Sequence, residues 1–212
     1  VPANSGSSGN WITYMAYPGD TVIIDGSGIN IGTSPGGSVQ GLIYIHNKNY
    51  IKFDGFQVTD STCHGVSVYQ SCDHITLKNL YITETGGCGF HISSTWNSAT
   101  LHPTNITVDG CECYHTNGDH DRETITMVCV DGFEVKNCKI HDTIFNGSLE
   151  WPCQNGINPQ ACANGTIHHN EVYNVMDGIY LGAHSNDPTG CNNVDIFCNF
   201  VHDCYWTTHN LG

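Results

Sequence analysis

The sequence predicts an all-β chain wound into a parallel β-helix, and three observations lead to this fold class. Only 12% of the 212 residues are charged, about half of the usual quarter, while glycine is abundant. No stretch shows the i, i+3, i+4, i+7 spacing of apolar residues that marks a helix. Six short segments instead share one pattern, in which an alternating strand, two turn-like residues and a second alternating strand follow one another.

The repeated segments lie at 50–60, 74–84, 105–115, 132–142, 165–175 and 194–204. Their common turn position, which recurs every 24 to 32 residues, is occupied by Gly55, Asn79, Gly110, Asn137, His169 and Cys198. Glycine and asparagine tolerate left-handed backbone, and strands this short do not fit regular hairpins. We therefore expect about seven coils of three short strands, with equivalent positions stacked about 4.8 Å apart.

Each repeat also predicts which residues face the interior. The second strand of each segment should bury one residue, namely Val58, Ile82, Cys113, Ile140, Val172 and Val201. In "GTIHHNEVY" (165–173), Ile167 and Val172 should point inward, and His168 and Glu171 outward. Insertions at 94–104, 116–121, 143–155 and 184–192 should bulge from the corners. We expect one domain over residues 1–212 without terminal caps, as in a segment of a longer chain.

Twelve cysteines, an even number, favour disulfides over free or metal-bound thiols, because no Cys-x2-Cys pair is present. Cys111 and Cys138 occupy equivalent positions on neighbouring repeats and form the first candidate pair. Cys129, Cys162 and Cys191 each stand three residues before an equivalent strand position and form a second column. One member of this column would then pair with a cysteine outside it. The sequence thus predicts a disulfide-stapled β-helix in an oxidising compartment.

The formal net charge of −14, with only six Lys and Arg residues, argues against binding of nucleic acid. The same charge disfavours acidic polysaccharides unless a divalent cation bridges them. No hydrophobic run is long enough to span a membrane. Three Asn-x-Ser/Thr sequences, at Asn105, Asn146 and Asn164, are candidate glycosylation sites. Together with the cysteines they predict an extracellular or cell-surface protein.

Residues 4–26, 123–142 and 156–183 resemble the secreted right-handed parallel β-helix repeat proteins, a family close to the polysaccharide lyases of pectate-lyase type. The resemblance implies a right-handed β-helix. It also implies Ca²⁺ held by clustered aspartates, and a Lys or Arg base that removes a proton next to a uronate carboxylate. Related sequences commonly have Asp and Lys where "GINPQ" (156–160) has Asn158 and Gln160, and glutamine cannot act as a base.

The acidic segment "NGDHDRETI" (117–125) is the best candidate site that remains. Asp119, Asp121 and Glu123 could bind a cation, since alternate residues of an extended segment face one side. Arg122, the only arginine in the chain, is the candidate catalytic base by the same resemblance. Two alternatives stay open, a structural calcium site without catalysis and a solvated acidic corner with an ordinary ion pair.

Two functions therefore compete at this point. One is a non-catalytic structural protein that assembles end to end into a filament or surface layer, because uncapped β-helix ends expose unpaired backbone. The alternative is a cation-dependent polysaccharide lyase, or a carbohydrate-binding module, that acts on an acidic polysaccharide. The expected partner is another copy of the chain in the first case and a polysaccharide in the second.

Overall fold

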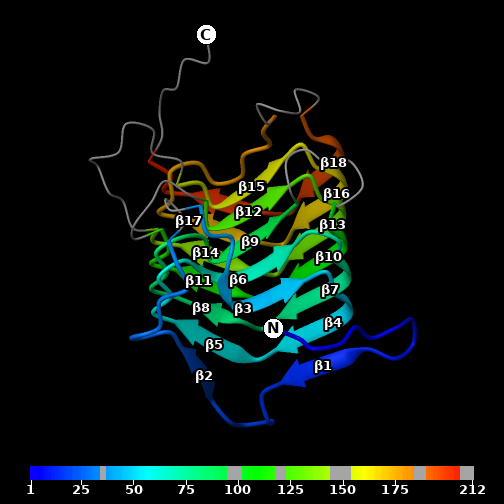
Figure 1. Cartoon of the computed structure of the whole chain (residues 1–212). Coiled ribbons are helices and arrows are strands. Elements are labelled where there is room, and N and C mark those ends of the chain that lie inside the picture. Colours follow the sequence, from blue (N-terminus) through cyan, green and yellow to red (C-terminus); the bar gives the residue numbers. More distant parts are fainter. Residues whose placement is uncertain (34–36, 95–101, 118–122, 144–153, 184–189, 206–212) are drawn as a thin grey trace.

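The computed structural model describes residues 1–33, 37–94, 102–117, 123–143, 154–183 and 190–205. The chain passes repeatedly through three parallel sheets, which enclose a common interior (Figure 1). This arrangement confirms the all-β prediction and the three short strands in each coil. Among the described residues no helix is long and apolar enough to cross a membrane.

Two of the sheets contain seven strands each, and the third contains five. The first sheet consists of β1 (Ile12–Met15), β4 (Asn49–Asp54), β7 (Asp73–Lys78), β10 (Thr104–Asp109), β13 (Asp131–Lys136), β16 (Ala163–His168) and β18 (Asn192–Phe197). The second consists of β2 (Val22–Asp25), β5 (Phe56–Thr59), β8 (Tyr81–Ile82), β11 (Glu112–Tyr114), β14 (Lys139–His141), β17 (Glu171–Tyr173) and β19 (Phe200–His202). The third consists of β3 (Gly41–His46), β6 (His64–Tyr69), β9 (Phe90–Ser93), β12 (Ile125–Val128) and β15 (Ile157–Gln160). Bridges from Ile179 and Gly182 to β15 extend the third sheet.

Left-handed residues recur at the same places in successive coils. The predicted turn position between the first and second sheets is confirmed, because all six of its residues have φ between 50° and 82°. A second column lies near the start of successive strands of the first sheet and contains Tyr50, His74, Asn105, Gly132, Asn164 and Asn193. A third column follows the second sheet: Asp60, Glu84, His115, Asp142, Asn174 and Asp203. Most of these residues are Gly, Asn, Asp or His, which adopt this conformation at the lowest cost.

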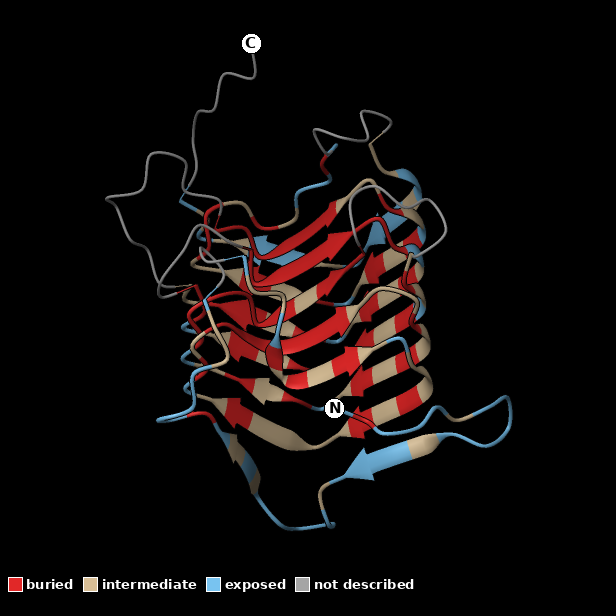
Figure 2. Cartoon of the chain, viewed as in Figure 1, coloured by how far each residue is buried: buried red, intermediate tan, exposed pale blue. Residues whose placement is uncertain are grey.

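The interior is filled by the alternate apolar residues of all three sheets (Figure 2). The predicted inward column is fully buried from Val58 to Val172, whereas Val201 on the outermost strand is 44% exposed. Ile167 is buried as predicted, and His168 and Glu171 are half-buried on the outer faces. Hydrophobic burial along the axis therefore holds the coils together, and it weakens at the end formed by β18 and β19.

Asparagine side chains replace apolar ones at one buried corner of the later coils. Asn170 is 2% exposed, and its Oδ1 accepts the backbone N–H of Cys138 at 2.9 Å. Its Nδ2 donates to the carbonyl of Val135 at 3.0 Å and to Oδ1 of Asn199 at 2.9 Å. Asn199 repeats the pattern one coil later by donating to the carbonyl of Ile167. These amides satisfy buried backbone groups that the sharp turn leaves without partners.

Cys111 and Cys138 stack on neighbouring coils as predicted, but both are thiols, so the predicted disulfide between them is wrong. The Cys138 thiol instead donates to the carbonyl of Lys136 at 3.1 Å. Cys162 and Cys191 are also adjacent thiols. Residues in register on parallel strands lie about 4.8 Å apart, while the Cβ atoms of a disulfide lie about 3.5–4.5 Å apart. Stacking alone therefore does not bring two sulfurs to bonding distance.

The predicted column of Cys129, Cys162 and Cys191 contains an error of one residue. The amide of Ala163 bonds to the carbonyl of Val130, just as the amide of Asn192 bonds to that of Cys162. Val130 is therefore the residue in register with Cys162, and Cys129 precedes it. Asp131 pairs with Ala163 and Phe133 with Gly165, so the left-handed Gly132 is in register with the left-handed Asn164. Matching Gly132 with Gly165, because both are glycine, therefore places Cys129 one residue too early.

Candidate functional site

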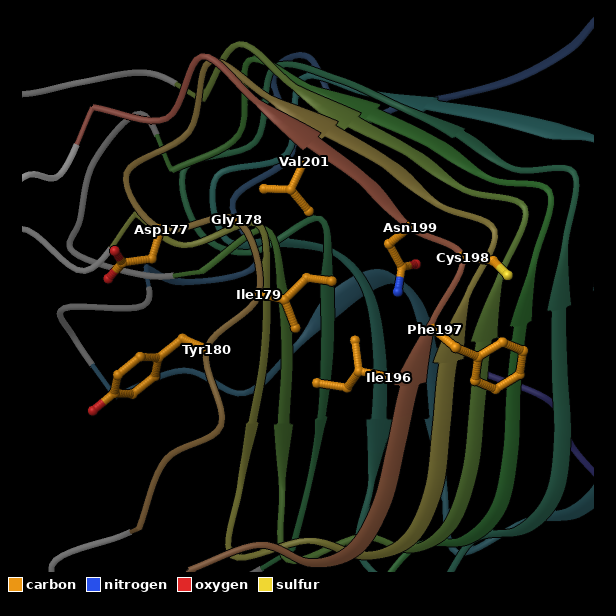
Figure 3. A pocket seen from close by; sticks show the side chains of 9 residues that line it. All are labelled: Asp177, Gly178, Ile179, Tyr180, Ile196, Phe197, Cys198, Asn199 and Val201. Atoms are coloured by element: carbon orange, nitrogen blue, oxygen red, sulfur yellow. The ribbon is translucent and has the colours of Figure 1, made fainter.

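The third sheet presents three outward-facing positions in each coil. The first, which directly precedes Gly65, Gly89, Thr124, Gly156 and Gly178, is occupied by His64, Cys88, Glu123, Asn155 and Asp177 in successive coils. The next outward column contains Ser67, His91, Thr126, Asn158 and Tyr180. The third contains Tyr69, Ser93, Val128, Gln160 and Gly182. Figure 3 shows this arrangement in the last of these coils, where Asp177 and Tyr180 point away from the interior and Ile179 points into it.

Glycine shapes the corner from which the first of these columns projects. A Cβ atom on Gly65 would lie 2.5 Å from Cγ2 of Ile82, and one on Gly156 would lie 2.5 Å from Cγ1 of Val172. Both neighbours are core residues of the second sheet, so the backbone packs directly against the interior here. The residue before each glycine is thereby turned outward.

Glu123, one of the predicted cation ligands, lies at the centre of a hydrogen-bonded cluster on this face. Glu123 is only 6% exposed. Its Oε2 accepts the Thr126 hydroxyl at 2.7 Å, and its Oε1 accepts Nε2 of Gln160 at 3.2 Å. The same Nε2 donates to Oδ1 of Asn158 at 2.5 Å, and Asn158 donates to the carbonyl of Tyr180 at 3.1 Å. Donors therefore compensate the buried carboxylate and fix the orientation of the Gln160 amide.

Two stacked imidazoles adjoin this cluster. The rings of His64 and His91 lie 4.3 Å apart and 5° from parallel, and His64 is 1% exposed. Nδ1 of His64 accepts the backbone N–H of Cys88 at 3.0 Å, which requires that nitrogen to be unprotonated. The sulfur of Cys88 lies 3.3 Å from the hydroxyl of Thr126. Imidazole, thiol, hydroxyl and carboxylate thus form one connected polar surface across three coils.

Solvent reaches His91, Gln160 and Tyr180 on this surface, and Tyr69 and Asp177 in the same outward columns. Ser67, Thr126 and Asn158 face the same way but are at most 3% exposed. The four insertions predicted from the sequence all adjoin strands of the third sheet, since each enters or leaves it. The polar surface therefore lies where the chain varies most in length from coil to coil.

The other predicted site residues have mixed outcomes. Arg122, Asp119 and Asp121 lie outside the described residues, as does Asn146. In the described part of the chain no three His, Cys, Asp or Glu side chains are arranged to hold a metal. The oxygens of Glu123 face hydroxyl and amide donors, so the described residues by themselves do not fit a calcium ion. A calcium requirement stays a prediction.

Asn105 and Asn164 lie on the first sheet, away from this surface. Both have left-handed backbone, and their Nδ2 atoms donate to Asp73 and Asp131 on the preceding coils at 2.8 and 2.7 Å. Both residues are exposed. Their glycosylation also stays a prediction.

Sequence reasoning missed His64, Cys88, His91 and Thr126. A second repeat could have revealed His91, and His64 and Cys88 directly before its glycine, although the coil of Thr126 has Thr124 in place of that glycine. In this repeat, glycine is followed by an apolar, a variable, an apolar and another variable residue. It occurs as "GVSVY" (65–69), "GFHIS" (89–93), "GINPQ" (156–160) and "GIYLG" (178–182). The two variable positions of this repeat are the outward columns of the third sheet.

Comparison with solved structures finds chains of similar fold and low sequence identity. A rhamnogalacturonan lyase superposes with a TM-score of 0.59 at 13% identity over 93% of this chain and 46% of its own. The pectate lyase Pel9A gives a TM-score of 0.47 at 15% identity, over 96% of this chain and 66% of its own. An alginate lyase from a Paenibacillus species gives 0.45 at 12% identity, over 95% and 83%. The present chain thus spans about half the length of the rhamnogalacturonan lyase.

The search of curated proteins gives no match. The family described as "Right handed beta helix region" matches residues 40–210, most of the chain. The match covers the third sheet and its polar surface as well as the repeats recognised in the sequence. The chain therefore belongs to the right-handed β-helix family, and its fold is that of a polysaccharide-lyase-like parallel β-helix.

Proposed function

We propose that this chain acts on a polysaccharide that binds along the outer face of the third sheet, and that it cleaves the polymer by β-elimination. The observation that carries the proposal is the cluster formed by Glu123, Gln160, Thr126 and Asn158 beside the stacked histidines. Titratable and amide side chains from several coils converge on this one outward face, which is a pattern expected of a binding or catalytic site.

The residues of the cluster suit different parts of this reaction. β-Elimination removes the proton next to the uronate carboxylate, breaks the C–O bond to the leaving sugar and forms a C=C bond between the two carbons. His91, a partly exposed imidazole on this face, would take up the proton and return it to the departing oxygen. Both donor contacts of the Gln160 amide go to Glu123 and Asn158, which leaves its carbonyl oxygen as the acceptor for a sugar hydroxyl. Glu123 is a positioning residue, because it acts through Gln160 and Thr126. Hydrolysis is less well supported, since it requires a pair of carboxylates flanking one bond.

The distribution of charge is compatible with an acidic substrate despite the net charge of −14. Many described acidic side chains belong to the first two sheets and to the corner after the second, including Asp54, Asp109 and Glu134, which bond to lysines. The outward columns of the third sheet contain two acids, Glu123 and Asp177. Rhamnogalacturonan, pectate and alginate are the substrate classes in the names of the structural neighbours, and each is an acidic polysaccharide.

The test is a cleavage assay with the full chain on rhamnogalacturonan, polygalacturonate and alginate. Unsaturated products are followed by ultraviolet absorbance and new ends by a reducing-sugar assay, with and without a chelator. His91→Ala should abolish product formation, and Glu123→Gln should reduce it, while Glu171→Gln on the second sheet should leave it unchanged. Reducing ends without unsaturated product would replace elimination by hydrolysis. Full activity of His91→Ala would refute the assignment of the base, and no cleavage of any polymer would refute the proposal.

A second candidate is the end-to-end assembly expected from the sequence. At the end of the described β-helix, a pocket of about 520 Å³ is lined by interior side chains such as Ile179, Ile196 and Val201 (Figure 3). Phe200 and Ile196 beside it are 63% and 44% exposed. In the described chain, β18 and β19 are edge strands. A further β-helical layer, from a second copy, would cover both the apolar surface and the unpaired edges.

Sedimentation and negative-stain microscopy of the full chain test this candidate. Filaments that Phe200→Asp disperses would support it, and monomers at all concentrations would exclude it. Both candidates are compatible with an extracellular or cell-surface location, which is also part of the proposal and is tested by fractionating the native source.

A further inference from the structure

The outer face of the first sheet carries a groove of about 430 Å³ that lies on a different sheet from the polar cluster. Thr76, Thr107 and Glu134 line it on three neighbouring strands, β7, β10 and β13, and Trp11, which precedes β1, lines it as well. The ring of Trp11 lies 6.3 Å from that of His74, which also belongs to β7. With strands about 4.8 Å apart, these three strands span roughly 10 Å along the helix axis.

The groove arises from a change in side-chain size along one column of the sheet. Trp11, Tyr50, His74, Asn105 and Gly132 occupy equivalent positions, because the residues that follow them pair strand by strand. The column therefore changes from an indole to a hydrogen atom over five coils. Its aromatic members form a wall, and the hollow opens toward Gly132.

The aromatic wall is held in place by its own members. The ring of Trp11 lies 5.6 Å from that of Tyr50 at 90°, and 6.3 Å from that of His74 at 73°. Tyr50 and His74 stack at 4.5 Å. Trp11 is nevertheless 40% exposed. A large aromatic side chain that is already fixed and remains exposed binds a ligand with little additional loss of conformational entropy.

The rest of the groove is lined by polar side chains, by the apolar Ile106 and Phe133, and by one carboxylate. Thr76 and Thr107 supply two outward hydroxyl groups on adjacent strands. The one carboxylate that lines it, Glu134, is bonded to Lys136 at 2.6 Å and to His168 at 3.1 Å. A sugar ring can pack its apolar face against the aromatic wall and direct its hydroxyl groups toward the hydroxyls of Thr76 and Thr107. The single carboxylate disfavours uronates.

We propose that this groove is a second carbohydrate-binding site, which takes a neutral oligosaccharide against Trp11 and binds it without cleaving it. This inference goes beyond the proposed function, since it concerns another sheet and another class of sugar. Such a site would hold the protein on neutral glycans while the third sheet acts on an acidic polymer.

Isothermal titration of the full chain with cellohexaose, xylohexaose, mannohexaose and galacturonic acid hexamer tests the proposal. Protein made in a bacterial cytoplasm is used, so that no glycan attached at Asn105 fills the groove. At least one neutral hexamer should bind, and Trp11→Ala should weaken it by about tenfold or more. Thr76→Arg, which fills the floor and leaves Trp11 in place, should weaken it equally.

Two control variants make the outcome decisive. Tyr17→Ala removes an aromatic residue that is 75% exposed and lies outside the groove, and should leave affinity unchanged. His91→Ala should also leave it unchanged, which separates this site from the third sheet. Equal affinity of wild type and both groove variants, or binding of the galacturonic acid hexamer alone, would overturn the inference, as would no binding of any neutral hexamer.

Discussion

Replacing Asn170 with alanine should destabilise the β-helix more than any loss of apolar surface at that position explains. The side chain accepts the N–H of Cys138 and donates to the carbonyl of Val135 and to Asn199. Alanine would leave the N–H of Cys138 buried without a partner, while the carbonyl of Val135 would keep its place in the ladder between β13 and β16. One such orphaned group costs about 1–3 kcal/mol, so we expect a loss of about 1–3 kcal/mol. That is a large share of the roughly 5–15 kcal/mol that stabilises a typical domain.

Urea unfolding followed by circular dichroism measures this loss as a shift in midpoint at constant slope. Asn199→Ala is the matched control, because it removes the same chemistry from an edge strand where Asn199 is only half-buried. Water can take the place of the half-buried Asn199 side chain and reach the N–H of Asn170 and the carbonyl of Ile167. The free energy of unfolding should therefore fall by only about 1 kcal/mol in this variant. A loss below about 1 kcal/mol for Asn170→Ala, or equal losses for both variants, would refute the argument from burial.

Three further predictions concern the corners and one thiol. Gly156→Ala should lower the free energy of unfolding in urea by about 1–3 kcal/mol, because the added Cβ would lie 2.5 Å from a core methyl group. Its control, Gly182→Ala on the outer face, should lower it by less than about 0.5 kcal/mol. The hydrogen bond from His202 to Asp203 raises the pKa of the His202 imidazole. The contribution of this contact to folding stability is therefore complete below pH 6.5 and is lost as the pH rises through the raised pKa. In an NMR titration, Asp203→Asn should lower the pKa of His202. A hydrogen bond from Cys162 lowers the pKa of Cys191 to about 6, so iodoacetamide should alkylate Cys191 well below pH 8. An alkylation rate of Cys191 that follows the pKa of an ordinary thiol would contradict this.

The coils and their corners could be predicted from the sequence because they depend on local rules. Left-handed turns require particular residues, such as Asn79 or Gly110, and strand alternation places Ile167 inward. The error at Cys129 comes from matching Gly132 with Gly165 by residue type, whereas the structure pairs Phe133 with Gly165. A search for recurring glycines and cysteines cannot detect a misalignment of one residue.

The site was harder to predict because it combines side chains from different coils. Glu123 was recognised as a candidate ligand, yet its partner Gln160 is 37 residues away along the chain. The stacking of His64 on His91 likewise depends on the register of two coils. From the sequence alone, these polar residues could equally well lie at solvated corners. Only the stacking of the strands determines which of their side chains contact one another.

The fixed corner between the first two sheets has an evolutionary consequence. From the turn between β7 and β8 onward, two residues make this turn in each described coil, whereas the segments that enter and leave the third sheet vary widely in length. One edge of the solenoid thus sets the register, and the other edge is free to accept insertions. A coil could be duplicated, or its loop exchanged for one from another coil, without disturbing its neighbours. New specificities could therefore arise by recombining loops on a scaffold whose stability they do not control.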